Sequence, residues 1–133
     1  VIEHLRDPET VLKEVYRVLE KGGVLIMTMP FLYAIHADPY DYQRWTPEKI
    51  KIEMNLAGFD RVDIRPMGSI FSVIYDLFHV SLNSASRNKS SITNKVLMRY
   101  VMPLAYRACK KLDIHYLYKS RYITTGYFVV CEK

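Results

Sequence analysis

Side chains that could carry out chemistry gather in one short segment, HADPYDYQRWTP, at residues 36–47. Polar and aromatic side chains of these types bind and orient substrates, and a histidine or carboxylate can also move a proton. The segment follows an apolar run at residues 24–29, and ligands in open α/β sheets bind beyond the carboxyl ends of the strands. We therefore predict one wall of a substrate pocket here. Its candidate residues are His36, Asp38, Tyr40, Asp41, Tyr42, Arg44 and Trp45.

A structural role would account for the same loop. Asp41 could pair with Arg44, while Trp45 packs as a hydrophobic staple and Thr46 caps the next helix. We expect the pocket in an intact parent protein and the structural role in this chain. If Arg44 lines the pocket, Arg44→Ala should weaken substrate use in a full-length version. Folding should stay nearly intact, because an exposed loop arginine contributes little to stability.

Alternating helices and strands must hold this loop. The expected elements are helices at 8–20 and 47–57 and strands at 24–29, 59–65 and 121–132. Asp7 and Thr46 are the expected N-caps of the two helices. Gly22 and Gly58 are expected to take the left-handed conformation that ends each of them. The apolar run at 24–29 predicts a strand covered on both faces.

Residues 67–120 differ in character and form a predicted helical insertion. Segments 68–83 and 92–113 are rich in apolar residues and predict helices, with Pro103 as a kink in the second. Residues 67–121 carry nine basic and two acidic side chains, so the chain's net charge of +5 originates there.

Two roles are open for this insertion. It could cover the active site as a lid whose basic side chains attract an anionic substrate or an anionic membrane surface. We favour the alternative of a helical hairpin packed on the sheet with a solvated basic face. No nucleic-acid partner is expected because no binding motif is present, and His79 and His115 are given no role. The basic residues are Arg87, Lys89, Lys95, Arg99, Arg107, Lys110 and Lys111.

The length and composition suit one globular domain. At 133 residues, half of them apolar, the chain can bury a moderate core, and we predict a single domain over residues 1–133. Cys109 and Cys131 lie far apart and match no zinc or redox spacing, which favours reduced thiols and a cytoplasmic location. We expect neither a secretion leader nor a membrane-spanning segment.

Two segments carry a resemblance to a known family. VIEHLRDPETVLKEVYRVLEKGGVLIMTMP at residues 1–30 resembles the second half of class I S-adenosylmethionine-dependent methyltransferases of the type 11-like group. In that family a Glu-His-Leu-like turn ends a strand, and a helix that ends in a Gly-Gly pair leads into the fifth strand. HADPYDYQRWTPEKIKIEMNLAGF at residues 36–59 is similar to a loop and helix in one branch of the family. The resemblance extends to about residue 66, and the last strand matches more loosely.

The resemblance implies a partial Rossmann-like α/β sheet of three strands with flanking helices. The last strand is expected to be antiparallel and to separate the strands at 24–29 and 59–65. The opening VIEH is expected to be the tail of a further strand. In the family the Gly-rich cofactor loop lies upstream of such a segment, and none of the five glycines here forms such a loop. The chain therefore resembles the C-terminal half of a truncated methyltransferase.

The resemblance also implies functional residues. S-adenosylmethionine is the expected cofactor of the intact parent, and we expect none to be bound by this chain alone. Glu3 and His4 are the candidate cofactor-binding residues, and His4 and His36 are the candidate catalytic residues. A Glu-His pair could position a hydroxyl, act as a base or bind a divalent ion, or it could be disordered. Two ligands do not make a metal site, so none is predicted. The candidate substrate-binding residues are His36, Asp41, Tyr42, Arg44 and Trp45.

The implied function is methyl transfer to a small molecule or glycoconjugate in the intact parent, with this chain inactive alone. The alternative is a non-enzymatic module that keeps the half-fold for interaction and assembly. In either case the strand at 24–29 would have one unpaired edge, which predicts a homo-oligomer through that strand. Ile26→Lys should disrupt the oligomer.

Overall fold

The computed structural model describes residues 1–86, 95–116 and 123–133. Arg87 and Lys89 of the expected lid, and residues 121–122 of the expected last strand, lie outside the described residues. The chain forms two compact units. The first comprises Val1–Phe31, Ile35–Pro66 and Gly126–Lys133, and the second comprises Leu32–Ala34 and Met67–Thr125.

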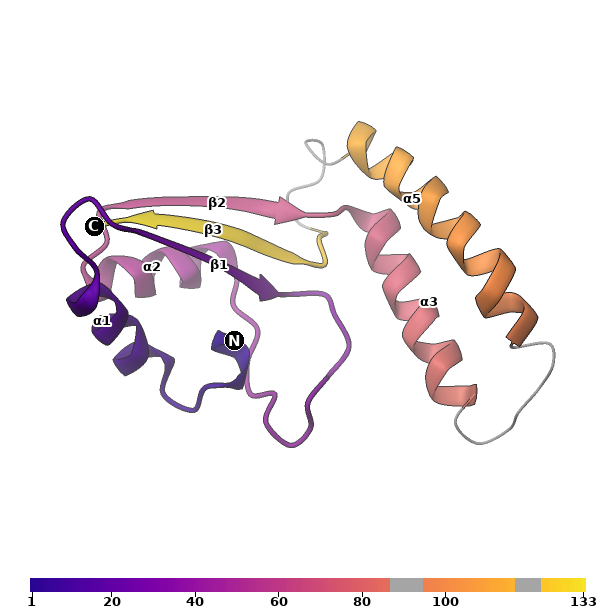
Figure 1. Ribbon diagram of the computed structural model, residues 1–133, viewed down its shortest axis with the longest axis horizontal. Helices are drawn as coiled ribbons and strands as arrows, with labels where there is room; N and C mark the ends of the chain where they lie inside the picture. Colours follow the sequence, from indigo (N-terminus) through magenta and orange to yellow (C-terminus); the bar gives the residue numbers. More distant parts are fainter. Residues whose placement is uncertain (87–94, 117–122) are drawn as a thin grey trace. The chain divides into compact units, whose positions relative to one another are not determined.

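The first unit is built on a three-stranded sheet. Its elements are η1 (Ile2–His4), α1 (Pro8–Val18), β1 (Val24–Pro30), α2 (Pro47–Ala57), β2 (Arg61–Met67) and β3 (Gly126–Glu132). β3 lies between β1 and β2 and is antiparallel to β1, with Val24 opposite Glu132 and Pro30 opposite Gly126 (Figure 1). The predicted α/β fold is confirmed, with the last strand antiparallel and between the other two.

Three of the four expected signals at the helix ends act as predicted. The exception is Gly22, which is left-handed with φ at +78° but does not end α1, because Leu19 is the C-cap of that helix. Asp7 Oδ1 accepts a hydrogen bond from the Thr10 amide at 3.1 Å, and Thr46 Oγ1 accepts one from the Lys49 amide at 3.3 Å. Gly58 ends α2 in the left-handed conformation, with φ at +114°. These short-range bonds satisfy helix-end amides and fix where α1 and α2 begin.

Both helices contribute to a single core. Leu12 of α1 and Ile50 of α2 belong to one buried cluster with Val129 of β3. Side chains alternate between the two faces of a strand, and on the other face of β1 Ile26 is 62% exposed. The expectation that this strand is covered on both faces is therefore wrong for the described residues, because α1 and α2 bury the same face.

The first residues form a 3₁₀ turn. The His4 amide donates to the Val1 carbonyl and the Leu5 amide donates to the Ile2 carbonyl, both at 3.1 Å. These amides bond within the turn and not to a neighbouring strand. The expectation that VIEH is the tail of a strand is therefore wrong, and Glu3 and His4 project from a turn.

The second unit contains the region predicted as a helical insertion. Its described helices are α3 (Ile70–Ser86), the π-helical turn η2 (Leu97–Val101) and α5 (Met102–Tyr116), and α3 packs along α5 (Figure 1). The buried Asp113 of α5 accepts hydrogen bonds from the Ser69 amide at 3.0 Å and from the Ser69 and Ser72 hydroxyls. Pro103 lacks the N–H that an α-helical bond to residue 99 would need, and η2 is the irregular turn just before it.

β3 begins at Gly126, later than expected, because Thr124 and Thr125 donate hydrogen bonds to Met67 and do not pair with β1. The Thr125 amide donates to the Met67 carbonyl at 3.2 Å, and the Thr124 hydroxyl donates to the same oxygen at 2.8 Å. Across the described residues, no helix combines the length and apolar character that a bilayer crossing requires.

Candidate functional site

A buried carboxylate holds the loop between β1 and α2. Asp41 accepts a hydrogen bond from the His36 amide at 3.0 Å, and its Oδ2 lies 2.7 Å from Nη2 of Arg44. The Asp41 side chain is only 2% exposed. The hydrogen bond from Arg44 holds the pKa of the Asp41 carboxyl well below its usual value, and the same contact raises the pKa of Arg44. Asp41 is therefore a buried anion with a fixed cationic partner.

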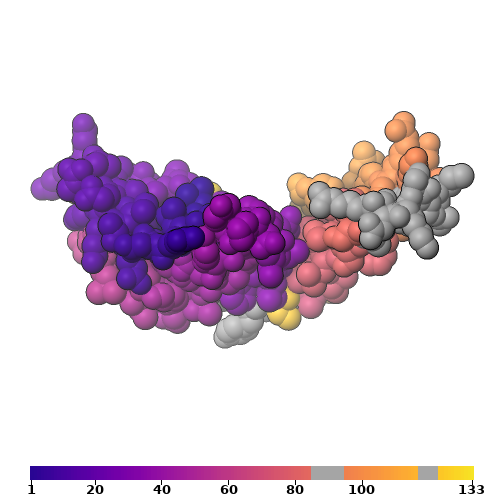
Figure 2. All heavy atoms as spheres, turned by 90° about the horizontal axis from the view of Figure 1, so that it is seen from below, coloured from indigo at the N-terminus to yellow at the C-terminus, as the bar shows by residue number. Residues whose placement is uncertain are grey.

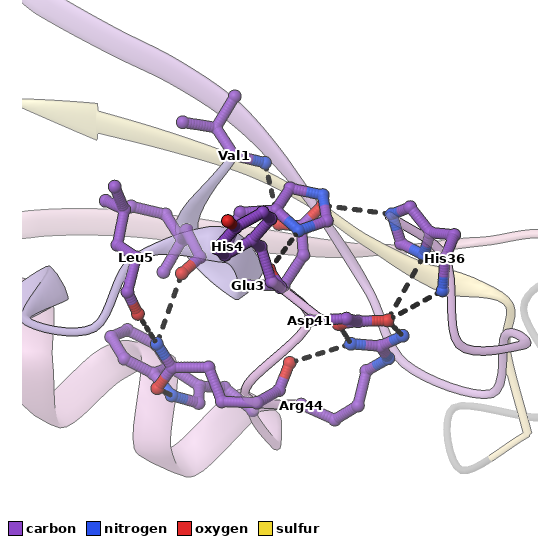
Figure 3. Close-up of polar contacts among 11 residues, drawn as sticks. Val1, Glu3, His4, Leu5, His36, Asp41 and Arg44 are labelled. Atoms are coloured by element: carbon purple, nitrogen blue, oxygen red, sulfur yellow. Dashed lines mark hydrogen bonds and ion pairs between the residues drawn. The ribbon is translucent and has the colours of Figure 1, made fainter. Parts of the chain in front are cut away.

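Glu3 and two histidines meet beside this ion pair (Figure 3). His4 Nε2 lies 3.4 Å and His36 Nε2 lies 3.6 Å from the same atom, Glu3 Oε1. The two imidazole rings meet edge to face with their centroids 4.8 Å apart. Burial raises the pKa of Glu3, but hydrogen bonds and the positive charge of the Val1 ammonium outweigh that effect and leave the pKa below its usual value. Glu3 is thus an anion that both rings face.

Backbone groups join the N-terminal turn to the loop. His4 Nδ1 lies 2.7 Å from the Tyr40 carbonyl oxygen, and the Tyr42 amide donates to the Glu3 carbonyl at 2.8 Å. The two segments lie side by side on one face of the first unit, the N-terminal residues in indigo and the loop in purple (Figure 2). Residues far apart in the sequence therefore share one site.

Gln43 is a positioning residue that carries no signal in the sequence. Its Nε2 donates to the carbonyl oxygens of Ile2 at 3.1 Å and Leu5 at 2.9 Å. Its Oε1 accepts a hydrogen bond from Trp45 Nε1 at 2.7 Å. Trp45 is 4% exposed and shares the core cluster with Ile50, as a hydrophobic staple would. The structure therefore places Trp45 in the packing of α2.

The other candidates lie at the exposed rim of the loop. Tyr42 accepts a hydrogen bond at its hydroxyl from Arg6 Nε at 3.1 Å, a contact that the sequence pattern does not suggest. Asp38 and Tyr40 are exposed, and Tyr40 takes part through its backbone carbonyl. Of the predicted site residues, the structure brings together Glu3, His4, His36, Asp41 and Arg44.

Arg44 is not the exposed arginine that the sequence led us to expect. Its side chain is 22% exposed and is bonded to Asp41 and to the Gln43 carbonyl. Its Nε atom is buried and has no hydrogen-bond partner within the described residues. The expected small effect of Arg44→Ala on folding assumed an exposed arginine, and that assumption is wrong. Removing Arg44 would leave the buried Asp41 carboxylate without its cationic partner.

The N-terminal part of this site matches a known family. Residues 1–27, which include Glu3 and His4, match the family model described as a methyltransferase domain. The predicted resemblance to methyltransferases is confirmed for residues 1–27. The cofactor that this resemblance implies for an intact parent is S-adenosylmethionine. The methyltransferase segment, residues 1–27, thus supplies two of the clustered side chains, and the loop after β1 supplies the others.

Two solved structures resemble the chain. One is phosphoethanolamine N-methyltransferase 2 of Haemonchus contortus in complex with S-adenosyl-L-methionine, with 17% identity and a TM-score of 0.49 over 100% of this chain and 31% of that chain. The other is this Haemonchus contortus enzyme with phosphomonomethylethanolamine and S-adenosylhomocysteine, with 16% identity and a TM-score of 0.49 over 99% of this chain and 31% of that chain. The chain thus spans 31% of the length of these two methyltransferases. No curated protein sequence matches it.

The described residues form a small cavity whose lining lies outside the histidine cluster. A cavity of about 230 Å³ lies at α1 and α2, below the roughly 300–1,000 Å³ of typical ligand pockets. Gly68 follows a strand and precedes a helix, but a Cβ there would meet the Ser72 side chain, so its small size serves packing. The cavity is lined by Glu9, Lys13, Glu53, Leu56 and Ala57, none of which belongs to the histidine cluster.

Proposed function

We propose that this chain is part of an S-adenosylmethionine-dependent methyltransferase that methylates a small molecule or a glycoconjugate. One observation carries the proposal: the methyltransferase segment contributes Glu3 and His4 to a cluster that the loop completes with His36. The described residues form the acceptor side of the site, and residues 1–133 alone are inactive.

Each clustered side chain has a role in this proposal. His36 and His4 accept the proton that an acceptor hydroxyl or amine loses, since imidazole can take up and release protons. Glu3 faces both rings and stabilises the positive charge that either ring would gain. Asp41 and Arg44 hold the loop in place through their ion pair and the hydrogen bond from the His36 amide to Asp41.

Cofactor binding tests the proposal. S-adenosylmethionine and S-adenosylhomocysteine are titrated calorimetrically into residues 1–133 and into the full-length protein, meaning the longest product encoded in frame with these residues. We expect saturable heats for the full-length protein and none for residues 1–133 alone. Absence of binding to the full-length protein would overturn the methyltransferase proposal, and binding to residues 1–133 would overturn the inactivity of the chain alone.

An assembly module is the second candidate, and the position of β1 favours it. β1 is an edge strand, since only β3 pairs with it in the described part of the chain. Its outer face carries Val24 and Ile26, both exposed. A second copy that pairs along this edge would satisfy the backbone groups and cover these side chains. The homo-oligomer expected through residues 24–29 is retained as part of this proposal.

Ile26→Lys is expected to weaken self-association of residues 1–133 by about fivefold or more, because an anchor at the centre of an interface contributes more than about 1 kcal/mol. Sedimentation velocity across a dilution series measures the change. Ile52→Lys is the matched control, since Ile52 is also exposed but lies on α2. A monomer at every concentration, or equal effects of the two variants, would contradict association through β1.

A further inference from the structure

We propose that Glu3, His4 and His36 form a binding site for a divalent transition-metal ion such as Zn²⁺. One donor atom from each of the three residues lies within 4.8 Å of the others. Two imidazoles and one carboxylate are a ligand set that suits Zn²⁺, Fe²⁺, Co²⁺ and Ni²⁺ better than Mg²⁺ or Ca²⁺. The Glu3-His4 pair alone lacks a third ligand, and the fold supplies it from the loop.

The hydrogen bond at Nδ1 of His4 leaves its Nε2, which faces Glu3, to bind a metal. Its Nδ1 lies 2.7 Å from the Tyr40 carbonyl oxygen, which can only accept a hydrogen bond. Nδ1 therefore carries the proton, and Nε2 of the neutral ring carries the lone pair. That Nε2 lies 3.4 Å from Glu3 Oε1. A backbone carbonyl on the far nitrogen is the usual arrangement for a metal-binding histidine.

His36 is oriented in the same way by a carboxylate. Its Nδ1 lies 3.4 Å from Asp41 Oδ2, and its Nε2 lies 3.6 Å from Glu3 Oε1. Arg44 Nη2 lies 2.7 Å from Asp41 Oδ2 and fixes that oxygen beside Nδ1 of His36, and an acceptor there favours the proton on Nδ1. Both rings thus present Nε2 to one oxygen of Glu3, with the Tyr40 carbonyl 2.7 Å from Nδ1 of His4 and an Asp41 oxygen 3.4 Å from Nδ1 of His36 (Figure 3).

Two of the three separations between donor atoms come close to those of a tetrahedral site. Ligands at about 2.0–2.1 Å from Zn²⁺ are separated from one another by roughly 3.3 Å in a tetrahedron. The two distances from Glu3 Oε1, 3.4 and 3.6 Å, lie near that value. The Glu3 side chain is 7% exposed and both histidines are partly exposed, so an ion could enter from the solvent side and keep an open position.

The Val1 ammonium is a competing cation in the present arrangement. It lies 2.7 Å from Glu3 Oε2, the oxygen that does not face the histidines. A metal on Oε1 would share the carboxylate with this group or displace it. N-terminal acetylation removes the ammonium charge, so binding that persists after acetylation would come from the three side chains.

Zinc binding to residues 1–133 tests the proposal by calorimetry after treatment with a chelator. We expect one Zn²⁺ per chain, in both the free and the acetylated form. Glu3→Gln and His36→Ala should each weaken binding by more than about 100-fold, and Asp41→Asn by about 10- to 100-fold, as expected for a ligand and for its orienting partner. His79→Ala is the matched control and should bind as the wild type does, because His79 lies on α3 outside the cluster.

A measurement on the wild type covers the case in which a variant fails to fold. In NMR spectra of the imidazole nitrogens, added Zn²⁺ should shift Nε2 of His4 and His36 and leave His79 and His115 unshifted. Unshifted His4 and His36 signals, or folded Glu3→Gln and His36→Ala variants that bind zinc with wild-type affinity, would overturn the metal site. A metal on Nε2 of both rings would occupy the lone pairs that proton uptake needs, so metal binding and the general-base role are alternative states of the cluster. Metal binding is measured without methyl transfer, so the two proposals can fail separately.

Discussion

An Arg44→Ala variant is expected to lose about 3 kcal/mol of its free energy of unfolding, the low end of the range for removing one partner of a buried ion pair. The low end applies because the Arg44 side chain is 22% exposed, whereas that of Asp41 is 2% exposed. Urea denaturation near neutral pH measures the loss. Arg17→Ala is the matched control: Arg17 pairs with Glu14 at 2.9 Å on the surface, and its removal should cost less than about 1 kcal/mol.

The loss of stability in Arg44→Ala should also depend on pH. The pKa of Asp41 is lower in the folded chain than the value of about 3.9 for an unfolded aspartate, so the contribution of this carboxylate is present above about pH 4. It falls as the pH drops from there toward the folded pKa. The difference in stability between wild type and Arg44→Ala should therefore shrink in acid. A loss no larger than that of Arg17→Ala, or a difference that stays constant in acid, would contradict a buried ion pair.

A Gly126→Ala variant is expected to lose about 3 kcal/mol or more, at the upper end of the range for overpacking. A Cβ at Gly126 would lie 2.4 Å from the Met29 carbonyl oxygen, and neighbouring backbone cannot move aside as a side chain can. Gly126 pairs with Pro30 at the last position of the ladder between β1 and β3. Pro30 is the last residue of β1, and the loop that carries His36 follows it. The clash would therefore open the end of the sheet that positions the cluster.

Gly22→Ala is the control for this second variant. Gly22 has φ at +78° and nothing within 4 Å of a Cβ, so the change adds left-handed strain without a clash. That strain costs about 1–2 kcal/mol. Chemical denaturation of both variants decides the matter. If Gly126→Ala were as stable as Gly22→Ala, the end of the sheet could relax around the added Cβ. That result would contradict the close pairing of Gly126 with Pro30.

The helices and the strand order were predictable because their determinants are local or are carried by the resemblance. Asp7 and Thr46 each satisfy an amide three residues away, a spacing that is visible in the sequence. The exposure of Ile26 was not predictable in the same way. An apolar run is compatible with one or two covered faces, and the arrangement of α1 and α2 decides between them.

In the site, too, local contacts could be predicted from the sequence and tertiary contacts could not. The pairing of Asp41 with Arg44 is local and was foreseen as one of two alternatives. The meeting of His36 with Glu3 and His4 depends on contacts such as those of Gln43 with the N-terminal turn, which no spacing in the sequence encodes. The burial of Arg44 also follows from tertiary packing, so a polar loop residue was wrongly expected to be exposed.

Methyl transfer from radiolabelled S-adenosylmethionine by the full-length protein is the measurement that tests the central claim most directly. The acceptors are small amines, phenols and glycoconjugates, and the wild type is compared with His36→Ala. The account predicts a labelled acceptor with the wild type and a rate about 10²- to 10⁴-fold lower with His36→Ala, the range for loss of a general base. No labelled acceptor with a folded full-length protein that has S-adenosylmethionine bound, or equal rates for the two proteins, would contradict it.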